Sequence, residues 1–123
     1  MADYVRWGVL STSGHAANTV IPAMKAAPSG RVMAVASRDA ERARAYAATQ
    51  GIPHSYGSYE ALLADPDIDA VYIPLPNSLH REWTIRAAGA GKHVLCEKPL
   101  ALNAAEAEEV VAACRQAGVK LAE

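Results

Sequence analysis

The sequence has few cysteines, no excess charge of either sign and no long apolar run. Cys96 and Cys114 are its only cysteines and form no CxxC pair, so they make no disulfide framework, and we expect a reduced, cytoplasmic setting. Twelve basic residues against 13 acidic ones give a net charge of −1, which argues against nucleic acid as a partner. No apolar run reaches the ~18 residues of a membrane span. Residues 1–6 lack the pattern of a secretory signal, so we expect no membrane partner.

Several well-marked catalytic motifs are also missing. The sequence has no GxxxxGK(S/T) phosphate loop, no HExxH zinc motif and no GxSxG nucleophile motif. The histidines are scattered without metal-ligand spacing, so no metal site is expected; they are His15, His54, His80 and His93.

What the sequence does contain is an ordinary globular composition, with 51% hydrophobic and 20% charged residues over 123 positions. This length predicts one domain with its own core. Short β-rich runs alternate with longer Ala-rich segments. Strands are expected at 4–10, 31–37, 54–56, 70–73, 93–96 and 119–122, and helices at 16–27, 40–50, 58–64, 78–90 and between 103 and 118. The alternation predicts the α/β class, as a doubly wound parallel sheet with helices on both faces.

The expected helix ends carry their own signals. Pro22 falls inside the first helical pattern and predicts a kink or a shorter helix. Asp39 is placed to cap the helix at 40–50, and Gly51 is placed to close it. Asn103 followed by Glu106 resembles a capping box.

The turn after the first strand has the small residues that a dinucleotide-binding turn needs. Ser11, Ser13 and Ala16 would stand at the tight turn, at the close approach to the pyrophosphate and at the helix–strand contact. Two of these positions commonly hold glycine, but a serine hydroxyl can donate to a phosphate oxygen at a helix N-terminus. The alternative is a polar loop whose Ser and Gly residues only cap the helix.

The second strand ends in Ser37, Arg38 and Asp39. An acidic residue at such a strand end accepts from the ribose 2′-hydroxyl of NAD, whereas an arginine there accommodates the 2′-phosphate of NADP. No carboxylate stands at the strand tip, and the planar guanidinium of Arg38 suits a phosphate group. The alternatives are a surface position for Arg38 and, for Asp39, the helix cap that we favour.

Two further segments follow strands at the same expected edge of the sheet. The fourth strand runs into Leu75, Pro76 and Asn77, where proline keeps the loop extended. There Asn77 or Ser78 could merely cap the next helix, and His80 could be an exposed residue of its first turn.

The fifth strand ends at Cys96 and is followed by the segment Glu97-Lys98-Pro99. A partly buried lysine there could polarise a carbonyl or move a proton, but a surface Glu–Lys pair is the alternative, and Cys96 is expected to be a buried strand residue.

Taken in order, these segments resemble the cofactor domain of the glucose–fructose oxidoreductase / inositol dehydrogenase family. The resemblance is carried by WGVLST at 7–12, VIPA at 20–23, ASR at 36–38, PNxxH at 76–80 and GKHVLCEKP at 91–99, the last being the most specific. It covers essentially the whole chain. It therefore implies that residues 1–123 form a dinucleotide-binding Rossmann domain.

The resemblance also implies roles that the residues alone do not establish. It implies that Lys98 is catalytic beside the nicotinamide and the substrate carbon, and that Glu97 contacts the nicotinamide ribose. Ser37 and Arg38 match a pattern associated with NADP, with NAD also possible. The substrates implied are sugars, polyols and related cyclic alcohols or ketones. The implied cofactor site comprises Ser11, Thr12, Ser13, Gly14, His15, Ser37, Arg38, Leu75, Pro76, Asn77, His80, Glu97 and Lys98.

Two departures from the family pattern shape the expectation. Ser11 and Ser13 replace the commoner glycines, and the family's C-terminal substrate domain is absent from this chain. We therefore expect a truncated chain that binds cofactor without turnover and that self-associates through surface the second domain would cover. The alternatives are a stand-alone nucleotide-binding or interaction module and an engineered Rossmann fragment without catalysis.

Overall fold

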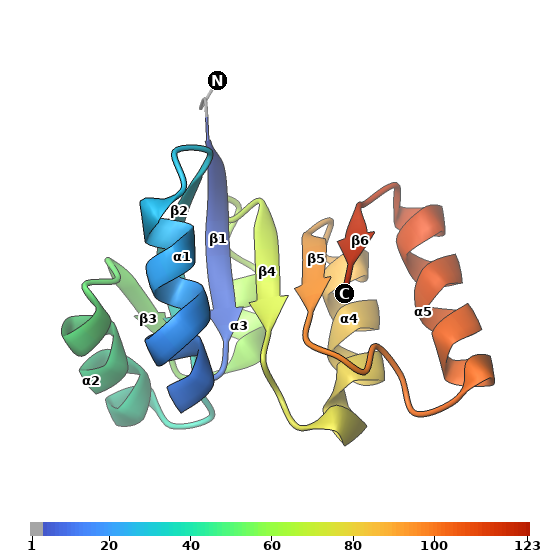
Figure 1. Ribbon diagram of the computed structural model, residues 1–123, viewed down its shortest axis with the longest axis horizontal. Coiled ribbons are helices and arrows are strands. Elements are labelled where there is room, and N and C mark those ends of the chain that lie inside the picture. Colours follow the sequence, from blue (N-terminus) through green and yellow to red (C-terminus); the bar gives the residue numbers. More distant parts are fainter. Residues whose placement is uncertain (1–3) are drawn as a thin grey trace.

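The computed structural model describes residues 4–123, which form a six-stranded sheet with helices on both faces (Figure 1). The strand order is β3-β2-β1-β4-β5-β6, and every pairing in it is parallel. The strands are β1 (Val5–Leu10), β2 (Gly30–Ala36), β3 (His54–Tyr56), β4 (Ala70–Ile73), β5 (His93–Cys96) and β6 (Leu121–Ala122). The predicted doubly wound parallel sheet is confirmed.

The helices lie between the strands in sequence, as predicted. They are η1 (Ala16–Val20), α1 (Ile21–Ala26), α2 (Ala40–Gln50), α3 (Tyr59–Leu63), η2 (Asn77–Leu79), α4 (His80–Gly89) and α5 (Ala104–Ala117). In Figure 1, α1 and α2 lie in front of the sheet, whereas α3 and α4 lie behind it. Each face therefore has its own apolar core, one packed under α1 and α2 and the other under α3 and α4.

Pro22 changes the form of the first helix, as its position in the pattern predicts. The segment begins with the π-helical turn η1, in which the Ile21 amide donates to the Ala16 carbonyl, and it becomes α-helical only at Ile21. Pro22 then stands in the first turn of α1, and having no N–H it cannot donate to a carbonyl of the preceding helical turn. The wider turn before it accommodates the proline ring within a continuous helical segment.

The predicted caps of α2 and α5 are confirmed. The Asp39 carboxylate accepts from the amides of Glu41 at 2.9 Å and Arg42 at 3.3 Å, and Gly51 closes α2 with φ +68°. Asn103 accepts from the Glu106 amide at 2.9 Å. The Glu106 carboxylate reaches the amide of Leu102 rather than that of Asn103, so the capping box is shifted by one residue.

Close packing behind β1 depends on Gly8. A Cβ at this position would lie 2.7 Å from Cδ2 of Leu62 and 3.3 Å from Cγ2 of Ile68, which is closer than carbon atoms pack. Leu62 belongs to α3, so the absent side chain lets that helix lie directly on the sheet. The carboxyl end of β1 is thereby fixed against its neighbours, which matters because the following turn enters the candidate site.

The opposite, amino edge of the sheet is braced by charged groups. The Arg6 guanidinium donates to both carboxylate oxygens of Asp69 at 2.9 and 3.0 Å, and the Arg6 amide donates to one of them at 2.9 Å. Buried Lys92 donates from Nζ to the carbonyls of Asp65 and Ile68, both at 2.7 Å. These bonds join β1, the segment before β4 and the segment before β5.

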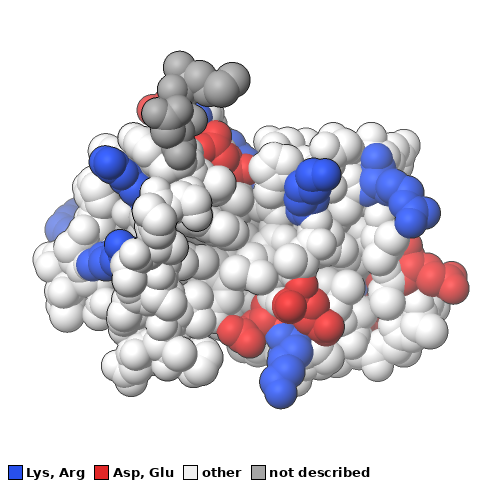
Figure 2. Space-filling view, turned by 45° about the horizontal axis from the view of Figure 1, so that its top comes forward, with Lys and Arg blue, Asp and Glu red and all other residues white. Residues whose placement is uncertain are grey.

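The two thiols and the surface charges follow the composition. Cys96 and Cys114 are free and buried, as expected for Cys96. Figure 2 shows Lys and Arg side chains and Asp and Glu side chains in small separate groups over the face that it presents. Within residues 4–123, no helix is long and apolar enough to cross a membrane.

Candidate functional site

The carboxyl ends of the strands meet at the lower edge of the sheet in Figure 1, and a cleft of about 460 Å³ opens there. Six of the predicted site residues line it: Ser11, Thr12, Ser37, Arg38, Leu75 and Pro76. They come from the turn after β1, the end of β2 and the loop after β4. The cleft is completed by Arg42, Tyr59, Ser78 and Leu79, none of which the sequence predicts as a cofactor-binding residue.

The turn after β1 is held in shape by its own serines. Ser11 has φ +144°, a backbone conformation in which glycine is favoured and other residues are rare. Ser13 accepts at Oγ from the Ala16 amide at 3.2 Å, so it does cap the helix, as the alternative interpretation of this loop proposed. That bond uses a lone pair of the hydroxyl, whose proton is still able to donate to an anion. Gly14 has open space where a side chain would be.

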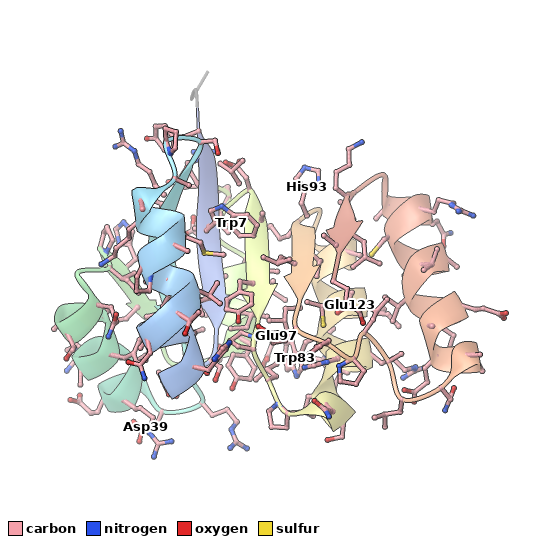
Figure 3. The ribbon with its side chains drawn as sticks, in the orientation of Figure 1. Trp7, Asp39, Trp83, His93, Glu97 and Glu123 are labelled. Atoms are coloured by element: carbon pink, nitrogen blue, oxygen red, sulfur yellow. The ribbon has the colours of Figure 1, made fainter. Side chains whose placement is uncertain are left out.

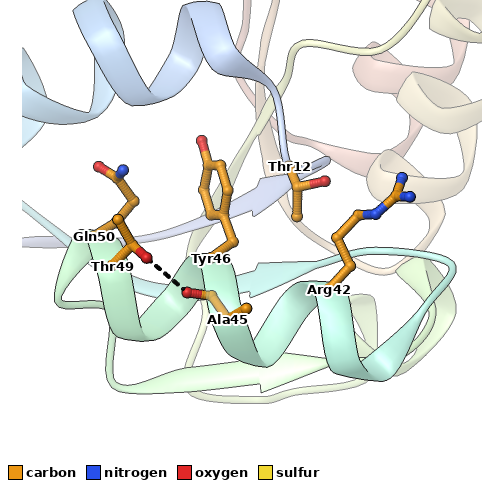
Figure 4. Close-up of a pocket in the computed structure, with 6 residues that line it drawn as sticks. All are labelled: Thr12, Arg42, Ala45, Tyr46, Thr49 and Gln50. Atoms are coloured by element: carbon orange, nitrogen blue, oxygen red, sulfur yellow. Dashed lines mark hydrogen bonds between the residues drawn. The ribbon is translucent and has the colours of Figure 1, made fainter.

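Helix α2 supports this turn from the side. The Tyr46 hydroxyl donates to the Ser13 carbonyl at 2.7 Å, and burial raises the pKa of Tyr46. Figure 4 shows Thr12 of the turn facing Arg42 and Tyr46 of α2 across a groove of about 420 Å³. The groove continues along α2, where the Thr49 hydroxyl donates back to the Ala45 carbonyl at 3.0 Å. Arg42 stands where this groove meets the larger cleft.

Two arginines face the larger cleft from the end of β2 and the start of α2. Arg38, which precedes the N-cap of α2, lines it as predicted, and Arg42 lines it from the first turn of α2. Both residues line the cleft, and no aspartate or glutamate of residues 4–123 does. Ser37 is nearly buried beside them, with its amide donating to the Tyr56 carbonyl and its hydroxyl accepting from the Asp39 amide. This end of the cleft is therefore suited to a group with two negative charges.

Of the four lining residues that the sequence patterns do not predict, Arg42 is the charged one. The signal that could have found Arg42 is a basic side chain in the first turn of the helix that follows the second strand. The pattern that begins at Asp39 indicates a capped helix, and it predicts no contact between that helix and a cofactor.

An aromatic wall closes the other side of this cleft. Tyr59 and Trp83 meet edge to face with ring centroids 5.0 Å apart, and both are buried. A neighbouring hollow of about 360 Å³ lies beside Arg38, and its lining includes Tyr59, Glu60, Leu79 and Trp83. The cleft thus joins cationic side chains to the ring of Tyr59, and Trp83 stands nearly perpendicular to that ring in the neighbouring hollow.

The loop after β4 departs from one alternative considered for it. No side-chain capping bond forms at the start of η2 or of α4, where the N-cap residues are Pro76 and Leu79. The interpretation of Asn77 as a helix cap is therefore wrong. Asn77 is the exposed first residue of η2 and follows Pro76, but it is not among the residues that line the cleft.

His80 is fully buried, so the alternative that it is an exposed residue of the first helical turn is wrong. Its Nδ1 lies 2.6 Å from the Pro99 carbonyl oxygen, and its Nε2 lies 2.7 Å from the Leu75 carbonyl oxygen. It therefore ties the loop after β4 to the loop after β5. With no exposed surface, it shapes the edge of the cleft by holding these loops, and it does not present a side chain to a ligand.

The segment after β5 lies on the other side of the β1 turn. Glu97 is at the carboxyl edge between α1 and β4, whereas Asp39 stands at the same edge under α2 (Figure 3). The Glu97 amide donates to the Ile73 carbonyl at 3.2 Å, and its carboxylate accepts from the Tyr72 hydroxyl at 2.5 Å. His15, an exposed residue of the turn, has Nε2 3.9 Å from the same carboxylate oxygen.

Lys98 is exposed at this edge. The partial burial that we expected for its ammonium group is not provided by residues 4–123. The surface Glu–Lys alternative is not supported either, because no ion pair joins Glu97 and Lys98 in the described part of the chain. Within residues 4–123, no group of three or more His, Cys, Asp or Glu side chains is arranged to hold a metal ion.

Comparisons with known proteins match this arrangement. A sequence model of a family described as an oxidoreductase family with an NAD-binding Rossmann fold matches residues 5–123. The D-xylose 1-dehydrogenase (NADP(+)) 2 of Haloferax volcanii is 54% identical over 117 residues, which are 95% of this chain and 36% of that protein. The 1,5-anhydro-D-fructose reductase of Ensifer adhaerens is 51% identical over 116 residues, which are 94% of this chain and 34% of that protein.

A solved structure gives the same result in three dimensions. A 3-ketoreductase from Actinomadura kijaniata, in complex with NADP and TDP-benzene, superimposes with a TM-score of 0.92 at 42% identity. The match covers 96% of this chain and 36% of that one. The chain thus spans about a third of the length of the relatives that it matches.

Proposed function

The chain belongs to the glucose–fructose oxidoreductase / inositol dehydrogenase family of oxidoreductases, and from this premise we propose that residues 1–123 form an NADP-preferring dinucleotide-binding domain. The observation that carries the preference is the pair Arg38 and Arg42 in a cleft that no carboxylate among residues 4–123 lines, the Glu60 carboxylate lining only the neighbouring hollow. In an NAD-specific domain an acidic residue at this strand end would accept from the ribose 2′-hydroxyl, and it would repel a 2′-phosphate.

The geometry fits a dinucleotide along the edge of the sheet. The 2′-phosphate would lie between Arg38 and Arg42, with the adenine against Leu79 and the Tyr59–Trp83 wall. The pyrophosphate would pass over the turn, where the Ser11, Thr12 and Ser13 hydroxyls and the amides of Gly14 and His15 are placed for its oxygens. Leu75, Pro76 and Asn77 would border the middle of the cofactor, and the nicotinamide end would lie beside Glu97 and Lys98.

For the whole protein we propose hydride transfer between the nicotinamide and a sugar, polyol or related cyclic alcohol or ketone. The relatives named above include a xylose dehydrogenase, an anhydrofructose reductase and a 3-ketoreductase, which supports this substrate class. The bound cofactor would supply the hydride acceptor or donor. Lys98 would hold or release the proton of the reacting oxygen, and Glu97 would orient the nicotinamide ribose.

We further propose that this chain alone binds cofactor without turnover, because Lys98 is exposed here and the relatives use a protein three times as long. We also propose a cytoplasmic setting for the protein. The chain alone should self-associate to some extent, which light scattering over a concentration series tests. The competing proposal is a stand-alone nucleotide-binding or interaction module, or an engineered Rossmann fragment that binds nothing.

The test is a calorimetric titration of the chain with NADP⁺ and NAD⁺ in parallel. We expect tighter binding of NADP⁺. Arg38→Ala and Arg42→Ala should each weaken NADP⁺ by about tenfold or more, because each removes a charge-assisted hydrogen bond, and should leave NAD⁺ nearly unchanged. Arg44→Ala is the matched control, because Arg44 is an exposed residue of α2 that pairs with Glu41 and does not line the cleft.

Equal affinities for NADP⁺ and NAD⁺ would contradict the assignment of the 2′-phosphate site. A chain that binds neither dinucleotide would be a Rossmann scaffold, and the binding proposal would fail. Turnover of a sugar by the 123-residue chain would contradict the proposal that it lacks catalysis.

A further inference from the structure

Tyr72 is a buried residue whose hydroxyl donates a hydrogen bond to Glu97. It is the third residue of β4 and only 1% exposed. Strand alternation places its neighbours Val71 and Ile73 in the core behind the sheet, whereas Tyr72 packs in the core under α1. The ring is surrounded by apolar side chains there, and a phenylalanine would fill the same space.

The hydroxyl of Tyr72 leaves this core at the carboxyl edge. It donates to Oε2 of Glu97 at 2.5 Å, across to the segment that follows the adjacent strand β5. The neighbouring residue Ile73 accepts from the Glu97 amide. Two consecutive residues of β4 therefore hold both the backbone and the carboxylate of Glu97.

This bond fixes the direction of the Glu97 carboxylate. Burial, and next the bond to Glu97, raise the pKa of Tyr72, so the phenol remains a donor throughout the working pH range. Oε2 is bonded to Tyr72 and lies 3.9 Å from Nε2 of His15. In the described part of the chain no hydrogen bond occupies Oε1, and the side chain is 36% exposed. One carboxylate oxygen is thus held by the protein while the other is open to the edge of the sheet.

We propose that Tyr72 is a positioning residue, whose hydroxyl orients the Glu97 carboxylate so that Oε1 accepts from a hydroxyl of the nicotinamide ribose. The assignment rests on the proposed function, because it takes Glu97 as the residue at the nicotinamide end. Tyr72 itself touches no cofactor, since its hydroxyl reaches the edge only through Glu97. Because the Glu97 side chain is already held in its binding rotamer, less conformational entropy is lost when the cofactor binds.

The test compares two ligands on the 123-residue chain. NADP⁺ contains the nicotinamide ribose, whereas adenosine 2′,5′-bisphosphate contains only the adenosine end with its 2′-phosphate. Tyr72→Phe keeps the ring and removes the hydroxyl. We expect it to weaken NADP⁺ about three- to tenfold, the effect of one hydrogen bond, and to leave the bisphosphate unchanged.

The control is Tyr56→Phe, which also removes a tyrosine hydroxyl bonded to a carboxylate. The Tyr56 hydroxyl donates to Asp65 at 2.6 Å, and its ring packs on the other face of the sheet. This variant should bind both ligands as the unmodified chain does. A double-mutant cycle adds a second readout, because Tyr72→Phe should have no further effect on NADP⁺ affinity once Glu97→Ala has removed the carboxylate.

The outcomes separate the two proposals. Equal weakening of both ligands by Tyr72→Phe would show a general structural effect and overturn the assignment, as would an unchanged NADP⁺ affinity. An additive effect in the Glu97→Ala background would also overturn it. In each case the NADP-binding function would stand. If the unmodified chain bound neither ligand, the proposed function would fail and the assignment of Tyr72 with it.

Discussion

At the scale of single residues, Ser11 is the one non-glycine residue with a positive φ among residues 4–123. Its φ of +144° is rare for any residue with a Cβ. Such a conformation costs on the order of 1–3 kcal/mol and persists only where the surroundings enforce it. The turn around Ser11 borders the cleft, so the strain is located where the chain must approach a ligand closely.

Ser11→Gly should therefore stabilise the chain. Glycine adopts this φ without steric cost, although its greater freedom in the unfolded chain offsets about 0.5–1 kcal/mol of the gain. We expect a net increase of about 0.5–1 kcal/mol in the free energy of unfolding, measured by urea denaturation. Ser11→Ala is the control, since it retains a Cβ and should give no such increase. Equal stability changes in both variants would show that the backbone conformation at Ser11 is not strained.

At the scale of elements, the start of α2 links stability to the site. The Asp39 carboxylate accepts from the Arg42 amide, so the cap holds the first turn of the helix that carries one of the two cleft arginines. An orphaned amide at a helix N-terminus otherwise has only water as its partner. The cap thus belongs to the same short segment as the proposed 2′-phosphate site.

Asp39→Ala should lower the free energy of unfolding by about 1 kcal/mol, the usual value of a lost N-cap. Asp39→Asn should restore most of this loss, because an asparagine side chain is also a good cap and can accept from the same amides. Urea denaturation of the three proteins measures both effects. If Asp39→Asn were as unstable as Asp39→Ala, the charge of Asp39 rather than its hydrogen bonds would be what matters.

The elements themselves could be predicted from sequence because each carries a local signal. Asp39, Gly51 and Asn103 mark helix ends through hydrogen bonds and backbone angles that involve only nearby residues. Pro22 marked a disturbed helix for the same reason, although the pattern did not show that the disturbance is a π-helical turn. Features that depend only on neighbouring residues, such as helix ends, can therefore be predicted from a single sequence.

Contacts between distant segments were less accessible. His80 has a position in its helix that suits an exposed residue, and only the fold brings the Leu75 and Pro99 carbonyls to its ring. The bond from Tyr72 to Glu97 joins residues 25 positions apart on adjacent strands, so no spacing rule announces it. Arg42 belongs to the cleft because β2 and α2 turn toward the loop after β4. Each of these contacts depends on the strand order of the sheet. A resemblance to a family indicates that order but not the individual side-chain contacts.

At the scale of the whole molecule, the two edges of the sheet have different tasks. The carboxyl edge holds the cleft and its exposed loops, whereas the amino edge holds the bidentate Arg6–Asp69 pair. The Tyr56–Asp65 bond ties the carboxyl end of β3 to the segment before β4. The Arg6 side chain lowers the pKa of Asp69, and the Tyr56 hydroxyl lowers the pKa of Asp65. The same bond, with burial, raises the pKa of Tyr56 to about 12. The bonds made by the segment before β4 therefore depend on two carboxylates, Asp65 and Asp69, remaining ionised.

This dependence predicts a loss of stability in acid. A carboxyl group whose pKa is lower in the folded chain contributes stability above its unfolded pKa, near 4, and that contribution disappears as the pH falls through the folded value. We expect the melting temperature to be level from pH 7 to about pH 5 and to fall below about pH 4.

Asp69→Asn should lower the melting temperature at pH 7 and make the fall in acid shallower, because Arg6 then no longer pairs with a group that titrates. Asp67→Asn is the control, since its exposed carboxylate lies 3.7 Å from Arg6 and should contribute little at either pH. An acid transition of equal depth in Asp69→Asn and the unmodified chain would show that the Arg6–Asp69 pair does not set the pH dependence of stability.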